Sequence, residues 1–274
     1  MQDSLFFDWY SASIPCSPNT VSSVFSATYP HCVWEITKPK NGYTHADALV
    51  DQHGETILTM FYGGANQGLN TFAFASGIHA ASFAINVRSA FPDHELVRAD
   101  VAVDYDEGGA WHSLYGHSVS VSAAVSVMNR YIGRAGAEVS VEEKQGRSLY
   151  LGSRSSPSMI RVYEKGKKDD RSRPDWVRAE FEFKPKGSDA RRFYAKASIL
   201  EIISSTKLGR RFFSTLGAAV TASPCAPGTV RVKTSHQQTM EHLIKQYGKV
   251  LLKELEIRGG SYEELGKALI HGAA

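Results

Sequence analysis

The sequence has 274 residues, 42% hydrophobic and 22% charged, and it contains no apolar run near the ~20 residues of a membrane-spanning helix, which excludes a helical membrane protein. Three scattered cysteines, Cys16, Cys32 and Cys225, exclude a disulfide framework, and together with a non-cationic N-terminus they predict a cytoplasmic location. The net charge of +3 is unevenly distributed: residues 144–211 hold 18 Lys and Arg against 8 Asp and Glu, a net charge of +10, and the remainder holds 13 against 20, a net charge of −7.

The first half of the chain is predicted to consist mainly of strands. Residues 6–14 alternate as a first strand, and 41–77 form a meander of strands separated by turns. An amphipathic helix is predicted at 79–91, closed by Pro92. The segment 97–109 then forms a strand that ends in an acidic turn.

In the second half, a helix at about 112–132 precedes a hairpin at 147–168. A further strand at 175–187 and a helix at 189–203 follow. Residues 221–233 are rich in Pro and Gly and are interpreted as a linker, after which two helices are predicted at 236–257 and 261–270. These elements predict an α+β fold: an antiparallel β-sheet core with flanking helices in residues 1–205, then a linker and a small C-terminal helical region in 206–274.

Three of the predicted strands have one apolar face and one charged face, as the period of two in a strand reveals. The apolar faces carry residues such as Ile160, Val101 and Phe181. The charged faces consist of Arg98, Asp100 and Asp104, then Arg161, Tyr163 and Lys165, and finally Arg178, Glu180, Glu182 and Lys184. If the three strands lie in one sheet, this face gathers a tyrosine, carboxylates and cations.

Such a face can cut a phosphodiester. Carboxylate oxygens are the ligands that Mg²⁺ or Mn²⁺ prefers, and the ion polarises a bound phosphate. Nearby cations would favour the phenolate form of Tyr163, which could attack DNA and release a free 3′-hydroxyl. A solvated face of mixed charge remains an open alternative, because tyrosine is favoured in strands and the chain has twelve of them.

The segments "RADVAVD", "GRSLYLGSRSSPSMIRVYEKG" and "WVRAEFEFKPK", in this order, resemble the replication initiation factor family. The resemblance extends from "DWYSASIP" to about residue 205. It implies a metal-dependent enzyme that nicks and rejoins one DNA strand to initiate rolling-circle replication, with residues 1–205 as the catalytic nicking and joining domain. The family includes initiators and relaxases of plasmids and filamentous phages, so a bacterial host cell is expected.

The resemblance also implies roles for particular residues. The tyrosine of the family's "R-x-Y-[DE]-K" block corresponds to Tyr163, its acidic strand to Asp100 and Asp104, and its "R-x-E" strand to Arg178 and Glu180. The expected metal ligands are Asp100, Asp104 and Glu180, holding Mg²⁺ or Mn²⁺. None of the ten histidines forms a His-x-His pair, so carboxylates must supply the metal site.

Several cations are expected to hold DNA. Arg161, Lys165 and Arg178 would bind phosphates in the catalytic site, and Arg154 would position the strand. A polar loop after Tyr163 would add contacts to the DNA backbone, through Lys167, Lys168, Arg171 and Arg173. The alternative is that Asp169 and Asp170 pair with these cations and leave the loop as a solvated surface.

The expected partners are single-stranded or supercoiled origin DNA and no membrane, with host helicase and polymerase as further candidates and a homodimer left open. Two other functions remain alternatives: a DNA-binding regulator that cuts nothing, and a metal-dependent nuclease that uses water.

Overall fold

Within the described residues, 5–64, 70–117, 137–142, 146–216 and 236–271, the computed structural model contains one sheet of ten strands. All of the strand pairs are antiparallel. The strands are β1 (Phe6–Ile14), β2 (Val33–Ile36), β3 (His45–Val50), β4 (Thr56–Tyr62), β5 (Thr71–Ser76), β6 (Glu95–Asp106), β7 (Ala137–Glu142), β8 (Gly146–Leu151), β9 (Ser158–Tyr163) and β10 (Trp176–Phe183).

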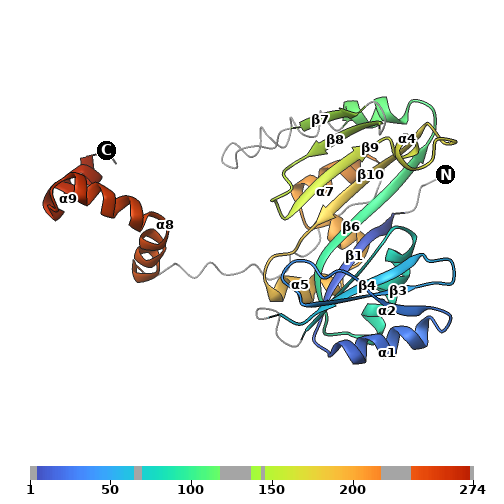
Figure 1. Cartoon of the computed structure of the whole chain (residues 1–274). Helices are drawn as coiled ribbons and strands as arrows, with labels where there is room; N and C mark the ends of the chain where they lie inside the picture. The colour runs from blue at the N-terminus through green and yellow to red at the C-terminus, as the bar shows by residue number, and fades with distance from the viewer. Residues whose placement is uncertain (1–4, 65–69, 118–136, 143–145, 217–235, 272–274) are drawn as a thin grey trace. The chain divides into compact units, whose positions relative to one another are not determined.

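The strand order is β2-β3-β4-β5-β1-β6-β10-β9-β8-β7 (Figure 1). The first strand therefore lies in the middle of the sheet and joins the N-terminal meander to the second half. The three strands with a charged face, β6, β10 and β9, are adjacent, as the sequence predicts. The fold class is α+β, which confirms the prediction of an antiparallel sheet with flanking helices.

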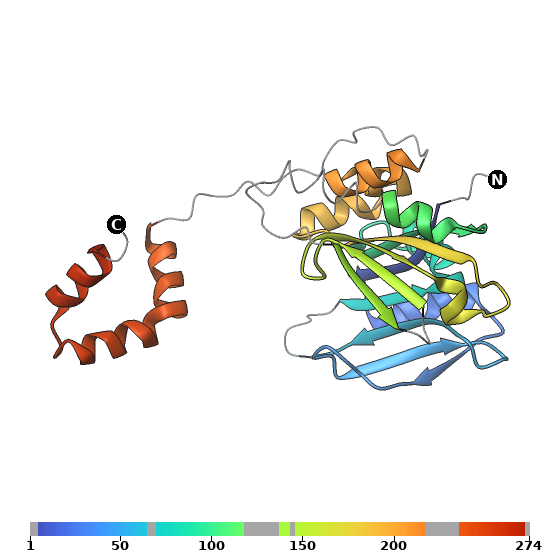
Figure 2. The same ribbon diagram turned by 90° about the horizontal axis from the view of Figure 1, so that it is seen from above.

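The helices of the first part pack mainly on one face of the sheet. They are α1 (Pro18–Thr28), the short 3₁₀ helix η1 (Gly77–His79), α2 (Ala80–Ala90), α4 (Lys165–Asp169), α5 (Ser188–Ala195), α6 (Ile199–Ser204) and α7 (Lys207–Thr215). Helix α2 contacts β1 and β5, α5 contacts β6, and α7 contacts β9. Figure 2 shows the orange helices on one side of the yellow strands, above them in this view.

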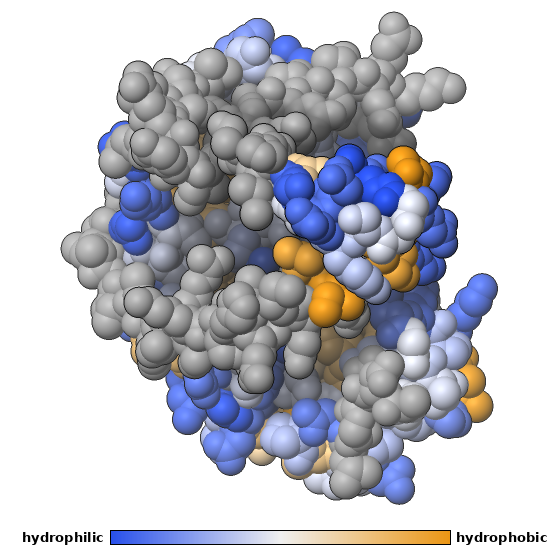
Figure 3. All heavy atoms as spheres, turned by 90° about the vertical axis from the view of Figure 1, so that its left-hand side faces the viewer, coloured by the Kyte–Doolittle hydropathy of each residue, from blue (hydrophilic) through white to orange (hydrophobic). Residues whose placement is uncertain are grey.

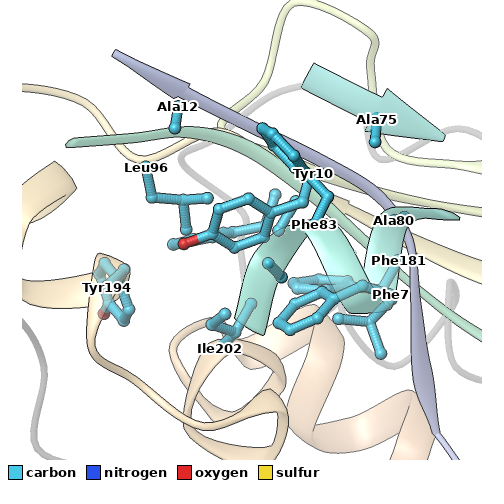
Figure 4. Close-up of a cluster of buried hydrophobic side chains, with 14 of the residues drawn as sticks. Phe7, Tyr10, Ala12, Ala75, Ala80, Phe83, Leu96, Phe181, Tyr194 and Ile202 are labelled. Atoms are coloured by element: carbon cyan, nitrogen blue, oxygen red, sulfur yellow. The ribbon is translucent and has the colours of Figure 1, made fainter. Parts of the chain in front are cut away.

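The core lies between these helices and the sheet. Tyr10 of β1 is completely buried, and its ring meets that of Phe83 of α2 edge-on at 6.3 Å (Figure 4). Its hydroxyl is hydrogen-bonded to Nε2 of His94 at 2.8 Å, which satisfies the phenol inside the core. Ala99, Val101 and Val103 of β6 are buried on this same side, so the alternation read from the sequence is confirmed.

The structure corrects two of the predicted helix boundaries. Residues 189–203 form two helices rather than one, because Ser198 starts α6 with a capping box in which its N–H donates to the Glu201 carboxylate at 2.6 Å. A single helix would place Leu200 on the same side as Phe193 and Ala197, but in the structure Leu200 is 42% exposed. The helix predicted at 112–132 is present at 110–117, and the rest of it lies outside the described residues. The sequence prediction did not include α1, β2, β7 or α7.

The first compact unit runs from Met1 to Gly228, and thus passes the boundary expected at residue 205. The reason is α7, whose Phe212 and Phe213 are buried in the core, the second ring meeting Phe181 edge-on at 6.2 Å. The function assigned to this part of the chain remains a proposal.

The second unit, Thr229–Ala274, contains α8 (His236–Ile257) and α9 (Tyr262–His271). These two helices match the predicted pair. Several apolar side chains of α8, such as Ile244, Tyr247 and Val250, are exposed.

No helix within the described residues is long and apolar enough to cross a bilayer. In the view of Figure 3, the coloured surface is mostly hydrophilic, with small separate hydrophobic areas.

Candidate active site

The face of β6, β10, β9 and β8 that points away from the core helices carries the predicted charged residues. In the observed register, Arg178 of β10 lies between Tyr163 of β9 and Asp104 of β6. Two residues further along β10, Glu180 lies opposite Arg161 of β9. We call this surface, with Asp8 of β1, the charged face. Its register follows from the buried alternate residues, since a slip by one residue would place charges in the core.

Tyr163 lies among the cations that the sequence predicts beside it. The guanidinium of Arg161 is 4.4 Å from the centre of the Tyr163 ring, and the ammonium groups of Lys168 and Lys165 are 5.7 and 6.0 Å away. The strand ends at Tyr163, so Lys165 belongs to α4 rather than to β9. Its ammonium group nevertheless stays near the phenol.

The pKa of Tyr163 differs from the expectation. Burial of the side chain, which is 5% exposed, and the carboxylate of Glu180 raise the pKa of the phenol well above its usual value, against the opposing effect of Arg161 and Arg178. The phenol is therefore neutral at physiological pH in this state. Cations alone do not produce the phenolate, because the loss of hydration and the nearby carboxylates outweigh them.

Asp8 is a part of this site that the sequence reading missed. Arg178 donates two hydrogen bonds to Asp104, at 2.6 and 2.7 Å, and one to Asp8 at 2.5 Å. A strict alternation in "FFDWYSASI" would place Asp8 on the core side with Tyr10. A register shift between Phe7 and Trp9 in the pairing of β1 with β6 changes the phase, and Asp8 reaches the charged face.

The three expected metal ligands do not gather into one site. Asp100 accepts two hydrogen bonds from Arg98, at 2.5 and 2.8 Å, Asp104 is bound to Arg178, and Glu180 is bound to Arg161 at 2.7 Å. Asp100 and Asp104 are four residues apart on one strand, a rise of about 13 Å, which is too far for bonds of ~2.0–2.6 Å to one ion. Among the described residues, no group of three or more acidic, histidine or cysteine side chains is arranged to hold a metal ion.

Asp100 itself belongs to a second carboxylate group. It shares Arg98 with Glu182, which accepts from the same guanidinium at 2.8 Å. Burial raises the pKa of Asp100 to about 7, and Glu180 and Glu182 add to the rise although Arg98 opposes it. Glu182 is also bound to Lys184, and Glu180 to Arg161, so the carboxylates of this part of the charged face are paired with cations.

Glu164, the residue after Tyr163, fixes the end of β9. The residue is 3% exposed. The carboxylate accepts a hydrogen bond of 2.7 Å from the backbone N–H of Arg147 and another of 2.7 Å from the guanidinium of the same residue. It also accepts one from the ammonium group of Lys167 at 2.9 Å. Against the cost of burial, these bonds lower the pKa of Glu164 to about 2. The acidic position of the family block is thus a structural anchor beside the tyrosine.

We expect Glu164→Gln to lower the free energy of unfolding at pH 7 by about 1.5–3 kcal/mol, the value of hydrogen bonds to a buried charge. The folded pKa of Glu164 lies below its unfolded value, so the stabilisation exists above about pH 4.5 and is lost as the pH falls towards 2. Urea unfolding followed by tryptophan fluorescence should show a smaller difference from the wild type at pH 3 than at pH 7. All four tryptophans lie in the first unit. Asp189→Asn, at a mostly exposed carboxylate, is the control, and an equal loss at both pH values would contradict the role of the charge.

The expected DNA-binding loop after Tyr163 begins as a short helix, α4, and only its later part is a loop. Lys167 binds Glu164, and Arg173 binds Asp106 at 2.6 Å. Asp169 pairs with Lys165, not with the loop cations. The exposed guanidinium of Arg171 has no carboxylate partner among the described residues.

Gly166 explains how α4 stays close to Tyr163. A Cβ atom at this position would lie 1.7 Å from the backbone oxygen of Arg173. Only glycine permits this close approach of the helix to the following loop. The approach keeps Lys165 and Lys168 beside the phenol.

A family model described as replication initiation factor matches residues 95–270, which is more than half of the chain. The chain belongs to the replication initiation factor family. The resemblance seen in the sequence is thereby confirmed, although the match includes the C-terminal helices, where the sequence reading found no resemblance, and starts only at β6.

Comparisons with solved structures and with curated proteins add no further assignment. A solved structure of a rolling circle replication initiator protein from Geobacillus stearothermophilus is similar over 78% of this chain and 96% of that chain, with 17% sequence identity and a TM-score of 0.49. No curated protein matches the sequence. The family match therefore carries the assignment to replication initiation proteins.

Proposed function

We propose that this chain initiates rolling-circle replication by cutting one DNA strand at an origin, with Tyr163 as the nucleophile, and later rejoining it. The observation that carries the proposal is the position of Tyr163. It lies in a family block on the charged face, where three cations surround its ring and Arg178 lies directly opposite. Origin DNA, single-stranded or supercoiled, is the proposed substrate.

In the cutting step, the Tyr163 oxygen attacks the phosphorus atom, and the bond from phosphorus to the 3′ oxygen breaks. The 3′ oxygen takes up a proton and leaves as a free hydroxyl, and the 5′ side remains as a phosphotyrosine. Asp8 and Glu180 are the candidate acceptors of the phenol proton, because their charges act on the phenol. In rejoining, a 3′-hydroxyl attacks the phosphotyrosine and restores the phenol. Arg161, Lys165 and Arg178 would hold the phosphate during both steps.

On one side of Tyr163, carboxylate side chains offer the oxygen ligands and the negative charge that a divalent cation requires. A cavity of about 570 Å³ is lined by more acidic than basic side chains. The charged residues that line it are Asp8, Asp104, Asp169, Asp170, Lys165 and Arg178. We propose that Asp8 and Asp104, which converge on one guanidinium, hold Mg²⁺ or Mn²⁺ as a pair of carboxylates. The ion would polarise the phosphodiester and offset the negative charge that raises the pKa of the phenol.

This proposal can be tested by incubating the protein with Mn²⁺ and a pool of short single-stranded DNA of randomised sequence. We expect one product with a free 3′-hydroxyl that a polymerase can extend, and a second product that remains attached to protein in SDS. A nuclease that uses water would leave both products free of protein. A DNA-binding regulator would leave the pool uncut.

We expect Asp104→Asn and Glu180→Gln each to reduce cleavage by about 10²-fold or more, the usual effect of losing one stabiliser of the transition state. For Asp104→Asn the loss should be greatest at limiting Mn²⁺. Glu95→Gln is a matched control, since Glu95 lies at the far end of the same strand as Asp104 and binds Ser188 and Arg192. Normal cleavage by both variants at limiting metal would show that these carboxylates are only surface charges.

A further inference from the structure

A second cavity opens on the charged face, on the other side of Tyr163 from the acidic one. Its volume is about 280 Å³, and strands β6, β8, β9 and β10 and the turn after β8 contribute to its lining. Four cations and two carboxylates line it, whereas the acidic cavity has four carboxylates and two cations among its described lining residues. A nucleic acid strand that crosses the charged face is therefore attracted more strongly to this side than to the acidic one.

The floor of this basic cavity offers a surface for a nucleobase. Tyr150 of β8 is half-buried, and Met159 of β9 is 5% exposed. The guanidinium of Arg154 lies 5.3 Å from the centre of the Tyr150 ring. Bases stack on aromatic rings and on arginine planes, whatever their sequence.

The cations of the cavity are not equally available. Arg98 and Arg161 are bound to carboxylates, and Lys184 is bound to Glu182 at 2.5 Å. Arg154 is exposed, and among the described residues it has no carboxylate partner. Its charge is free to bind a phosphate at the mouth of the cavity.

The cavity is close enough to Tyr163 to hold a neighbouring nucleotide. Arg161 lines the cavity and also lies over the Tyr163 ring. Tyr150 is directly opposite Arg161 in the pairing of β8 with β9, and Tyr163 is two residues further along β9, a rise of about 7 Å. A base seated on Tyr150 would thus adjoin the phosphate at Tyr163.

We propose that Tyr150, Met159 and Arg154 form a binding site for the nucleotide next to the phosphate that is cut. Its base stacks on the ring of Tyr150, the mostly buried Met159 forms part of the cavity floor, and Arg154 binds its phosphate. Tyr150 and Arg154 are positioning residues that hold the strand in line with the phenol. This inference rests on the proposed function, and it adds which side of Tyr163 the strand occupies.

The test measures binding separately from cutting. In the Tyr163→Phe background, we expect Tyr150→Ala to weaken binding of a short randomised single-stranded DNA by about 5- to 150-fold, the range for one lost stacking contact. Tyr150→Phe keeps the ring and should bind as the parent does. Fluorescence anisotropy gives the affinities, and circular dichroism checks that each variant is folded. Equal affinity for the Ala and Phe variants would overturn the proposal.

Arg154→Ala provides a second test that does not depend on the packing of β8, because Arg154 is exposed. We expect the slope of log affinity against log salt concentration to fall by about one unit. An unchanged slope would remove Arg154 from the site. If the wild type does not cut DNA but binding depends on Tyr150, the proposed function fails and the nucleotide site stands. If cutting occurs with an unchanged affinity and KM in Tyr150→Ala, only the nucleotide site fails.

Discussion

Replacing Tyr163 with Phe is expected to abolish DNA cleavage and the covalent adduct, a loss of at least about 10⁴-fold, as is usual when a nucleophile is removed. The change deletes only the hydroxyl. The ring stays in place between β8 and β10 and keeps its contacts with Arg161, Lys165 and Lys168. The free energy of unfolding and the affinity for single-stranded DNA should therefore remain close to those of the wild type.

Tyr150→Phe is the matched control for this experiment. Tyr150 lies on the same face, one strand away, and the same change there removes a hydroxyl that has no role in the proposed reaction. It should cut DNA normally. Normal cutting by Tyr163→Phe would remove Tyr163 as the nucleophile, and loss of cutting in Tyr150→Phe would make Tyr150 the candidate instead.

Arg178→Met is expected to have the largest effect on stability and also to abolish efficient cutting. Arg178 is 5% exposed and binds both Asp8 and Asp104. Its loss leaves two partly buried carboxylates facing each other without a cation, which costs about 3–5 kcal/mol. Apart from this loss of stability, the rate of cleavage by the folded protein should fall by about 10²–10³-fold, because a cation opposite the phenol is lost from the transition state.

The double variant Arg178→Met with Asp104→Asn separates these two effects. Removing one carboxylate should recover part of the stability lost in Arg178→Met, as measured by urea unfolding. It should recover none of the cleavage activity. No recovery of stability would mean that the ion pairs with Arg178 do not account for its effect on folding.

The sequence predicted the charged face well, because the signal was local. Apolar residues alternate with charged ones in β6, β9 and β10, and only one register keeps Val101, Phe181 and Ile160 in the core. The positions of Tyr163, Arg161 and Arg178 relative to one another follow from this. The order of the strands in the sheet, with β1 in its middle, depends on contacts far apart in the sequence and could not be read from the alternation.

Other features of the site depend on geometry that a pattern does not contain. The register shift after Asp8 changes the phase of β1, so a period of two assigned this carboxylate to the wrong face. The pKa of Tyr163 depends on how far its side chain is buried, and the sequence shows only its charged neighbours. The metal prediction treated Asp100 and Asp104 as one site because they share a face, but sharing a face does not bring residues four apart on a strand together.

The most direct test of the account is to identify the residue that becomes attached to DNA. The wild-type protein is incubated with Mn²⁺ and the randomised single-stranded DNA, the adduct is isolated in SDS, and the DNA is digested to leave a nucleotide on the peptide. Mass spectrometry of the peptides should find the added nucleotide phosphate on Tyr163 alone. Cleaved DNA with no modified peptide, or with the modification on another residue, would contradict the proposal that Tyr163 is the nucleophile.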